Sequence, residues 1–271
     1  MTAPRAAMTL PILTYHRLLP QNPARSADPM RISVSQDRFR RHLRWLKRFG
    51  YRTVGLEEYI KRLRHHPHPA PSPLEGERRE GGRPFAITFD DGYEEVLTLG
   101  LPVLQEFGFT ATVFAVSAEE HNRWDDGNAR LMSAEQLRRW RAAGMEVGAH
   151  SCTHPHLTRI NRESARREIR DSRTGLEQVL GQTVTMLAYP YGESNPEVEA
   201  LAREAGFEAA FATDQAPRDH FQNLYRLRRS VVFPGNTAWE ILIKAQRWYP
   251  AYQDFKRGRR EEGRVTRGLP K

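Results

Sequence analysis

The chain lacks the features that mark disulfide-rich or membrane-spanning proteins. It has a single cysteine, Cys152, in 271 residues, which excludes an internal disulfide framework and a cysteine-rich zinc module. It has no run of about 18 apolar residues, so we expect no membrane-spanning helix. Its N-terminal segment has no apolar stretch of the kind that a secretory signal needs, which predicts a cytoplasmic location.

Acidic residues are scarce relative to basic ones. The chain has 42 Lys and Arg against 33 Asp and Glu, a net charge of +9, and residues 252–271 hold seven basic and three acidic residues. We interpret most of the excess as solvated helix faces and expect the C-terminal part to attract anionic lipid headgroups weakly. No nucleic-acid-binding motif accompanies the charge, so we expect no nucleic-acid partner.

Short apolar runs alternate with amphipathic helical segments along most of the chain. The runs expected to form strands are 10–15, 51–54, 84–89, 109–116, 145–149, 184–189, 207–212 and 227–233. Such alternation predicts parallel strands with helices outside the sheet. Seven or eight units favour an α/β fold in the form of a distorted, incomplete (β/α) barrel rather than an open sheet.

The pattern also predicts the domain organisation. We expect a flexible N-terminus at residues 1–9, a single domain over residues 10–250 and a basic tail over residues 251–271. Residues 64–83 are rich in proline and glycine and predict a disordered surface insertion. The histidines in it, His65, His66 and His68, make a poor metal site because a mobile loop is a poor cage.

Four of the expected strands end in polar or aromatic residues, and two of these ends carry groups that can bind a metal. Asp90 and Asp91 come directly after the run 84–89. Because neighbouring residues of an extended chain point in different directions, the two carboxylates can take different roles. The alternative is an ordinary Asp-Gly turn with a helix cap.

Two histidines spaced four residues apart, His150 and His154, follow the run 145–149. Two imidazoles and one carboxylate form a common facial set for a divalent metal, which leaves positions open for water and substrate. His156 is a further candidate ligand, ranked below His154 because Pro155 redirects the chain. Cys152 could also bind a metal, although a lone cysteine is more often a small buried residue.

Aromatic residues end two other strands. The sequence Tyr189-Pro190-Tyr191-Gly192 can aim a backbone N–H into a cleft and form a wall for a sugar ring, with an ordinary turn as the alternative. His16 follows Tyr15 at the end of the first run, where a lone histidine is usually a satisfied structural residue.

Together these strand ends resemble the NodB-type polysaccharide deacetylases, carbohydrate esterase family 4. The sequence TFDDGY at 88–93 matches the first motif of the family, HSCTH at 150–154 matches the second, and YPYG at 189–192 matches the core of the third. The resemblance covers most of residues 10–235. It implies a distorted, incomplete (β/α) barrel, in agreement with the strand–helix alternation.

The resemblance also implies a metal site. Asp91, His150 and His154 would hold a divalent metal, which is usually Zn²⁺ in such enzymes, with Co²⁺ or Ni²⁺ as alternatives.

The same resemblance implies catalytic roles. Asp90 would be the general base, and the backbone N–H of Tyr191 would help to stabilise the oxyanion, with Pro190 and Tyr189 in the same substrate-facing turn.

Two family features are missing. The arginine that normally precedes the third motif and orients the base is absent, since residues 185–188 read TMLA, and no C-terminal Leu-x-His segment exists because no histidine follows His220. The segment LTYHRLLP at 13–20, however, resembles the N-terminal segment of the poly-N-acetylglucosamine deacetylase branch. This makes His16 the candidate general acid.

The implied function is removal of the N-acetyl group from an N-acetylated amino sugar or glycan of the N-acetylglucosamine type by a metal-dependent hydrolase. A first alternative is a deacylase or deformylase of a lipid-linked sugar, or another hydrolase of non-peptide C–N bonds on the same scaffold. A non-catalytic glycan-binding protein is a second alternative, disfavoured because all four motif carboxylates and imidazoles are intact. We expect a monomer whose partner is a glycan or a lipid-linked sugar, with weak membrane contact through the basic tail.

Overall fold

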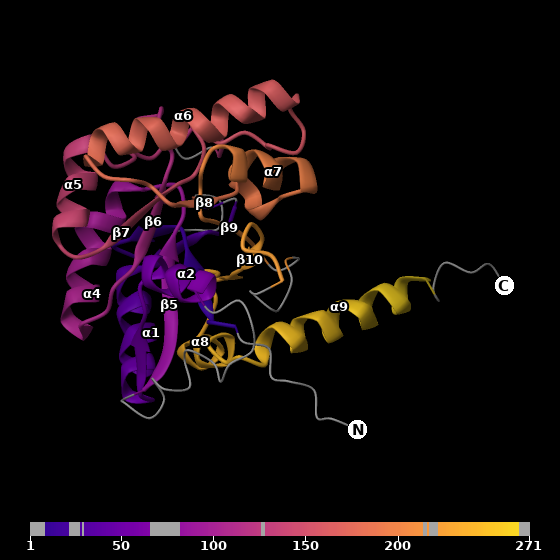
Figure 1. The fold of residues 1–271 in the computed structure, drawn as a ribbon. Coiled ribbons are helices and arrows are strands. Elements are labelled where there is room, and N and C mark those ends of the chain that lie inside the picture. The colour runs from indigo at the N-terminus through magenta and orange to yellow at the C-terminus, as the bar shows by residue number, and fades with distance from the viewer. Residues whose placement is uncertain are drawn as a thin grey trace.

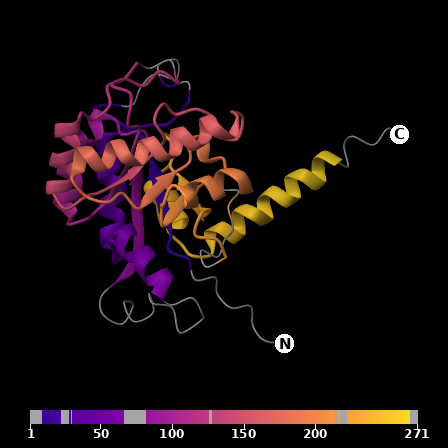
Figure 2. The ribbon, with the colours of Figure 1, turned by 45° about the horizontal axis from the view of Figure 1, so that its top comes forward.

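The computed structural model describes residues 9–21, 28, 30–65, 82–125, 128–213, 216 and 222–265. Within these residues, nine parallel strands form one sheet, and helices cover its outer side (Figures 1 and 2). The strands follow one another in space in the order β10 (Leu227–Arg228), β9 (Ala209–Ala212), β8 (Met186–Ala188), β7 (Glu146–Ala149), β6 (Thr112–Ala115), β5 (Arg83–Phe89), β1 (Ile12–Tyr15) and β11 (Ser230–Val231), with β4 (Tyr51–Thr53) paired to β5. A separate parallel pair joins β2 (Arg17–Leu19) to β3 (Ser33–Ser35).

The two outermost strands, β10 and β11, belong to one stretch of chain. Leu227 of β10 pairs with Phe211 of β9, whereas Ser230 of β11 pairs with Leu13 of β1, and Arg229 lies between them. This stretch therefore bridges the two edges of the sheet and nearly closes it into a barrel. The predicted (β/α) barrel in a single domain is confirmed, and the run 227–233 is divided between two edges rather than forming one strand.

The helices lie outside the barrel and are amphipathic. On α1, for example, Phe39, Leu43 and Leu46 recur at helical spacing and are buried, and Ser35 caps the helix by accepting a hydrogen bond from the backbone N–H of Arg38. The helices and helical turns are α1 (Gln36–Arg48), α2 (Leu56–His65), the π-turn η2 (Val96–Gly100), α4 (Leu101–Phe107), α5 (Ala134–Ala142), α6 (Arg162–Leu180), the 3₁₀ turn η3 (Pro190–Gly192), α7 (Pro196–Glu204), α8 (Ala238–Lys244) and α9 (Tyr249–Val265). No helix in the described part of the chain is both long enough and apolar enough to span a bilayer.

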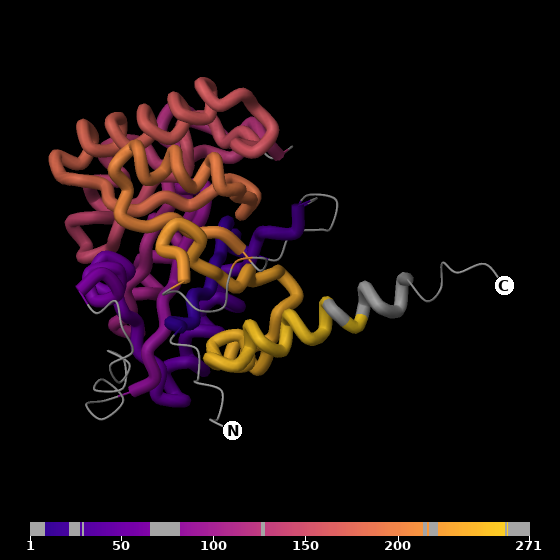
Figure 3. The backbone as a smooth tube through the Cα atoms, turned by 45° about the vertical axis from the view of Figure 1, so that its right-hand side comes forward, coloured from indigo at the N-terminus to yellow at the C-terminus, as the bar shows by residue number. Residues whose placement is uncertain are grey.

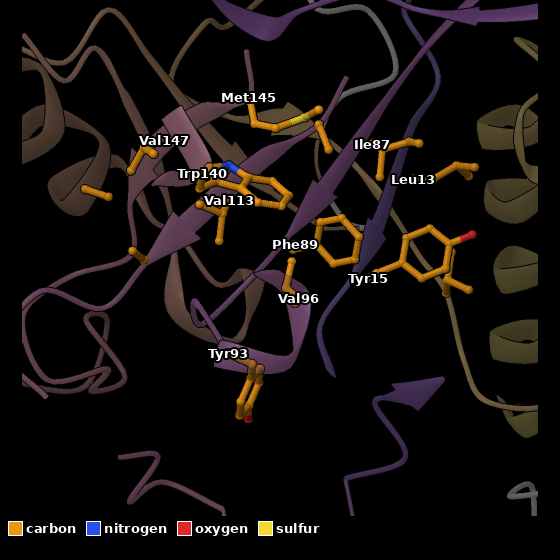
Figure 4. Close-up of a cluster of buried hydrophobic side chains, with 14 of the residues drawn as sticks. Leu13, Tyr15, Ile87, Phe89, Tyr93, Val96, Val113, Trp140, Met145 and Val147 are labelled. Atoms are coloured by element: carbon orange, nitrogen blue, oxygen red, sulfur yellow. The ribbon is translucent and has the colours of Figure 1, made fainter. Parts of the chain in front are cut away.

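The core has two parts because successive side chains of a strand point to opposite faces. Leu13, Ile87 and Val113 point outward and pack with Trp140 of α5 in the layer between sheet and helices (Figure 4). The alternate strand residues form a second buried cluster, together with apolar residues of α2: Ile12, Ala86, Phe114, Met186, Ala188, Phe211 and Leu227 are among its members. Both faces of the strands are therefore covered, which explains why the strand runs are almost continuously apolar.

The predicted segment boundaries are only partly within the described residues. Residues 1–8 and 66–81, which include His66 and His68, lie outside them, and Thr9 is buried. The predicted basic tail begins inside α9, so its described part is helical. The division into residues 1–9, 10–250 and 251–271 stays a prediction.

Candidate metal centre and active site

The polar residues singled out in the sequence follow the carboxyl ends of neighbouring strands. His16 follows β1, Asp90 and Asp91 follow β5, His150 follows β7, and Tyr191 lies just beyond β8. Because the strands are parallel, their carboxyl ends meet at one end of the barrel, where (β/α) barrels carry their functional sites. These residues line a cavity of about 240 Å³, whose wall is formed by His16, Met30, Ile32, Asp90, Asp91, Trp124, Asp125, His150, His154, Tyr191, Gly192, Thr213, Val231 and Phe233.

Asp91, His150 and His154 converge at the floor of this cavity. The Nε2 atoms of His150 and His154 lie 3.4 and 3.3 Å from the same carboxylate oxygen, Oδ1 of Asp91. The three residues are buried and each offers a ligand atom within 4.8 Å of the others. Donors that bind zinc tetrahedrally at about 2.0–2.1 Å stand about 3.3–3.4 Å apart, so these separations fit a single ion.

The hydrogen bonds around the cluster also fit a metal site. The Nδ1 of His150 lies 2.8 Å from the carbonyl oxygen of Ala188, and since a carbonyl only accepts, this nitrogen carries the proton. Nε2 of His150, 3.4 Å from Oδ1 of Asp91, is thus the ring nitrogen that is left to bind a metal. This is the usual arrangement of a metal-binding histidine, whose second nitrogen donates to a carbonyl or carboxylate.

Asp91 is charged in spite of its burial. Burial alone raises the pKa of a carboxyl group, but the hydrogen bonds from His150 and His154 outweigh it and hold the pKa of Asp91 well below its usual value. An ionised carboxylate is the form that binds a cation, so the three side chains together are suited to a divalent metal.

The backbone at the site is held in an uncommon conformation. Asp91, Ser151, His154 and Tyr191 have positive φ angles of 71°, 63°, 62° and 60°, although none of them is glycine. Such residues cost about 1–3 kcal/mol each and persist where the surroundings fix them. For His154 one fixing contact is clear, because its backbone N–H donates to Oγ of Ser151 at 3.0 Å.

Asp90 is held by an arginine that the sequence analysis missed. Arg229 donates from Nη1 to Oδ1 of Asp90 at 2.6 Å and from Nη2 to Oδ2 at 2.9 Å. Its guanidinium is fully buried and also contacts Oγ1 of Thr88 at 3.3 Å and the carbonyl of Ala212 at 3.4 Å. Burial raises the pKa of Asp90, but the charge of Arg229 prevails and the pKa is lowered.

The sequence did contain a signal for Arg229. Arg228 and Arg229 interrupt the run 227–233, whose only other polar residue is Ser230, and arginine is almost never fully buried unless it is paired. The pairing with Asp90 was not evident because the two residues are 139 positions apart. The position normally occupied by the family arginine, just before the third motif, holds apolar Leu187 and Ala188 instead.

His16 also lies close to Asp90. Its Nε2 is 3.9 Å from Oδ2 of Asp90, and its side chain is 18% exposed. Within the described part of the chain, its buried Nδ1 has no hydrogen-bond partner. His16 is therefore an imidazole close to the carboxylate and in contact with the cavity.

The turn at residues 189–192 places its members differently. The ring of Tyr191 packs edge-on against His154, with centroids 4.7 Å apart, and stacks on His156 at 3.6 Å, while Nδ1 of His156 lies 3.1 Å from Glu193. Tyr189 is fully buried and donates its hydroxyl to the carbonyl of Tyr225 at 2.8 Å. Neither Tyr189 nor Pro190 lines the cavity.

Two further cavity residues, Trp124 and Asp125, were not singled out in the sequence. The Trp124 ring stacks on His154 with centroids 4.3 Å apart, and Asp125 accepts a hydrogen bond from the Tyr93 hydroxyl at 3.1 Å. Asn122 supports this loop, since its side-chain oxygen accepts from the backbone N–H groups of both residues. No periodic pattern marks this loop in the sequence, so nothing there pointed to a functional role.

Cys152 lies apart from the metal cluster. Its Sγ is 3.6 Å from Oγ of Ser117, and its backbone N–H donates to Glu168. Burial raises the pKa of its thiol to about 11, so the thiol is protonated at neutral pH and is a poor ligand or nucleophile.

The comparisons with known proteins agree with this geometry. Residues 77–210 match the family model described as polysaccharide deacetylase. Among curated proteins, the chain is similar to YxkH of Bacillus subtilis, with 26% identity over 226 residues that cover 83% of this chain and 72% of YxkH. It is also similar to the poly-beta-1,6-N-acetyl-D-glucosamine N-deacetylase of Staphylococcus epidermidis, with 24% identity over 249 residues that cover 86% of this chain and 81% of that protein.

Solved structures show the same fold. The Streptococcus pyogenes deacetylase PplD superposes with a TM-score of 0.73 at 22% identity, covering 89% of this chain and 99% of PplD. IcaB from Ammonifex degensii superposes with a TM-score of 0.67 at 23% identity, covering 89% of this chain and 97% of IcaB. With its motifs brought together in this fold and its central part matching the family model, residues 77–210 form a domain of the polysaccharide deacetylase family.

Proposed function

We propose that the protein is a metal-dependent hydrolase that removes the N-acetyl group from N-acetylglucosamine units of a glycan. The observation that carries this proposal is the convergence, in one cavity, of the Asp91–His150–His154 cluster with an Asp90 carboxylate held by Arg229. The similarity to an enzyme named as a poly-beta-1,6-N-acetyl-D-glucosamine N-deacetylase supports the choice of sugar.

Asp91, His150 and His154 would hold the metal. Two imidazoles and a carboxylate suit Zn²⁺, and Co²⁺ and Ni²⁺ accept the same donors. When bound, the metal supplies Lewis acidity, which polarises the amide carbonyl and lowers the pKa of a water molecule.

Asp90 would act as the general base. Its lowered pKa keeps it ionised at neutral pH, and Arg229 fixes the plane of the carboxylate. Each carboxylate oxygen has two lone pairs, so an oxygen that accepts from Arg229 can still receive a proton from the attacking water.

His16 would act as the general acid. It lies 3.9 Å from Asp90 and lines the same cavity. While Asp90 takes a proton from the attacking water, His16 can therefore deliver a proton to the leaving nitrogen. General acid–base help of this kind contributes about 10²–10⁴-fold to a rate.

The backbone N–H of Tyr191 would stabilise the oxyanion. Tyr191 lies in the cavity wall with φ of 60°, and its ring is held between His154 and His156. A fixed donor aimed at the developing negative charge contributes about 3–4 kcal/mol. Pro190 and Tyr189 would support this turn rather than touch the sugar.

A second candidate is deacylation or deformylation of a lipid-linked sugar. The observation that favours it is that two apolar side chains of the cavity wall, Met30 and Phe233, are 48% and 45% exposed. Such side chains can pack against an acyl chain as well as against a sugar face.

The experiment that tests the proposal measures the carboxylic acid released from matched substrates by metal-reconstituted protein. We expect acetate release from β-1,6-linked N-acetylglucosamine oligomers, its loss with a chelator, and its return when Zn²⁺ is added. Release only from an acyl or formyl lipid-linked sugar would favour the second candidate. Binding of the oligomers with no acid released from any of the substrates would contradict both candidates.

A further inference from the structure

Helix α9 leaves the body of the protein from the end of α8 and extends away from the barrel (Figures 1 and 3). Its first turns are attached to the barrel through Gln253 and Asp254. Arg228, which is buried in β10, donates to Oδ1 of Asp254 at 2.9 Å and to Oε1 of Gln253 at 3.3 Å. The side of α9 that carries Gln253 and Asp254 therefore faces the barrel.

Aromatic residues lie on the opposite side, at Trp248 just before α9 and at two positions within the helix. Trp248, Tyr252 and Phe255 are 54%, 47% and 62% exposed. At 3.6 residues per turn, these three side chains fall within about 60° of one another, and the centre of this aromatic stripe lies about half a turn from Gln253 and Asp254. The stripe is thus directed away from the barrel by the way in which the helix is attached.

Basic residues accompany the aromatic stripe, with Lys256 beside it and Arg259 one turn beyond Phe255 on the same side. Lys256 and Arg259 are exposed, and the guanidinium of Arg259 lies over the ring of Phe255, 5.5 Å from its centroid. The sequence that follows is also basic, since seven of the residues 252–271 are Lys or Arg and three are acidic. A helix with aromatic residues on one face and Lys or Arg beside them has the composition of helices that lie in the plane of a membrane surface.

We propose that the aromatic stripe of α9 docks the protein on the surface of an anionic lipid bilayer. The three aromatic rings enter the boundary between headgroups and acyl chains, where tryptophan and tyrosine are favoured, and Lys256 and Arg259 meet the lipid phosphates. The helix lies on the bilayer and does not span it. Docking places the barrel beside the membrane and does not depend on the reaction that the barrel catalyses.

Charge favours a lipid surface over a second copy of this chain. Two α9 helices packed through their stripes would bring Lys256 and Arg259 of each copy close to those of the other. Like charges at such an interface repel, whereas anionic headgroups attract them. A lipid bilayer is therefore the occupant that satisfies both the aromatic and the basic residues.

The test is sedimentation of the full chain with phosphatidylcholine vesicles that contain or lack phosphatidylglycerol. We expect binding only to the anionic vesicles and release at high salt. The variant W248S/Y252S/F255S should bind at least about tenfold more weakly, because the apolar area that enters the interface is lost. Its circular dichroism and thermal unfolding should match those of the wild type, since the replaced side chains are exposed.

Two matched controls show whether binding depends on where the replaced residues lie or only on the loss of a tryptophan or of positive charge. W239S removes a tryptophan that is 59% exposed on α8, and it should leave binding unchanged where W248S weakens it. K256E/R259E should abolish binding, whereas R166E/R167E, which makes the same charge change on α6, should retain most of it.

Three results would overturn the proposal. One is a wild-type chain that does not bind to anionic vesicles. Another is equal loss of binding in W248S and W239S, or in the two charge variants. The last is self-association that W248S abolishes while vesicle binding is absent, which would assign the stripe to a second copy.

Discussion

Arg229, which lies where the two edges of the barrel meet, donates hydrogen bonds to both carboxylate oxygens of Asp90. It lies between the strand that pairs with β9 and the strand that pairs with β1, so the residue that separates the two edges of the sheet also orients the carboxylate in the cavity. In this chain, closure of the barrel and placement of the proposed base thus depend on the same few residues.

Loss of Arg229 should affect both stability and the pH dependence of the reaction. In R229M the buried Asp90 carboxylate loses its partner, which typically costs about 3–5 kcal/mol. Because Arg229 lowers the pKa of Asp90, its removal should raise that pKa and shift the acidic limb of the pH–rate profile to higher pH. R229K keeps the charge but loses the paired hydrogen bonds. Its stability and the position of its acidic limb should therefore fall between those of the wild type and R229M.

Denaturant unfolding and pH–rate profiles of the wild type, R229K and R229M check this prediction. If R229M has wild-type stability and an unchanged acidic limb, Arg229 neither stabilises the fold nor lowers the pKa of Asp90, and the prediction is wrong.

Replacement of Asp90 should separate catalysis from metal binding. Asp90→Asn keeps the shape of the side chain but cannot accept a proton, so turnover should fall by about 10²–10⁴-fold or more. The metal content, measured by elemental analysis, should equal that of the wild type because Asp91, His150 and His154 are untouched. The assignment of the base fails if Asp90→Asn turns over at the wild-type rate.

Two histidines offer a matched test of the ligand set. His150 belongs to the buried cluster, whereas His156 stacks on Tyr191 and lies 3.1 Å from Glu193. We expect His150→Ala to lose more than about 100-fold in metal affinity, since even residues that only support a ligand cost 10–100-fold. His156→Ala should retain the metal. Metal titration into the stripped proteins gives both values, and equal affinities in the two variants would refute the ligand set.

His42 should make stability depend on pH. It is buried between the Tyr15 hydroxyl and the carbonyl of Asn236, and burial lowers its pKa from 6.5 to about 4. Below pH 6.5 the unfolded chain binds a proton at this position that the folded chain does not bind until about pH 4. His42 therefore stabilises the fold above pH 6.5, and about 3 kcal/mol of this is lost as the pH falls to 4.

The measurement is the free energy of unfolding as a function of pH for the wild type and for His42→Gln. The difference between the two curves isolates His42 from other groups that titrate in this range. A difference that does not change between pH 6.5 and 4 would contradict the lowered pKa.

Local patterns predicted much of the fold and brought the motif residues to one end of the barrel. The apolar runs give the strands because most strand residues are buried on both faces, and the polar residues that follow them mark the carboxyl ends. Arg229 could not be placed in this way, because its role depends on a stretch that pairs with two strands far apart in sequence. Trp124 and Asp125 come from a loop that Asn122 shapes locally, but its place beside the metal cluster depends on tertiary contacts with Tyr93 and His154.

The most direct test of the central proposal is titration of Zn²⁺ into metal-stripped protein with acetate release from N-acetylglucosamine oligomers as the readout. We expect acetate release to rise in proportion to bound metal and to reach its limit at one ion per chain. Acetate release at full rate from the stripped protein, or a fully loaded protein that releases none, would contradict the proposed reaction at Asp91, His150 and His154.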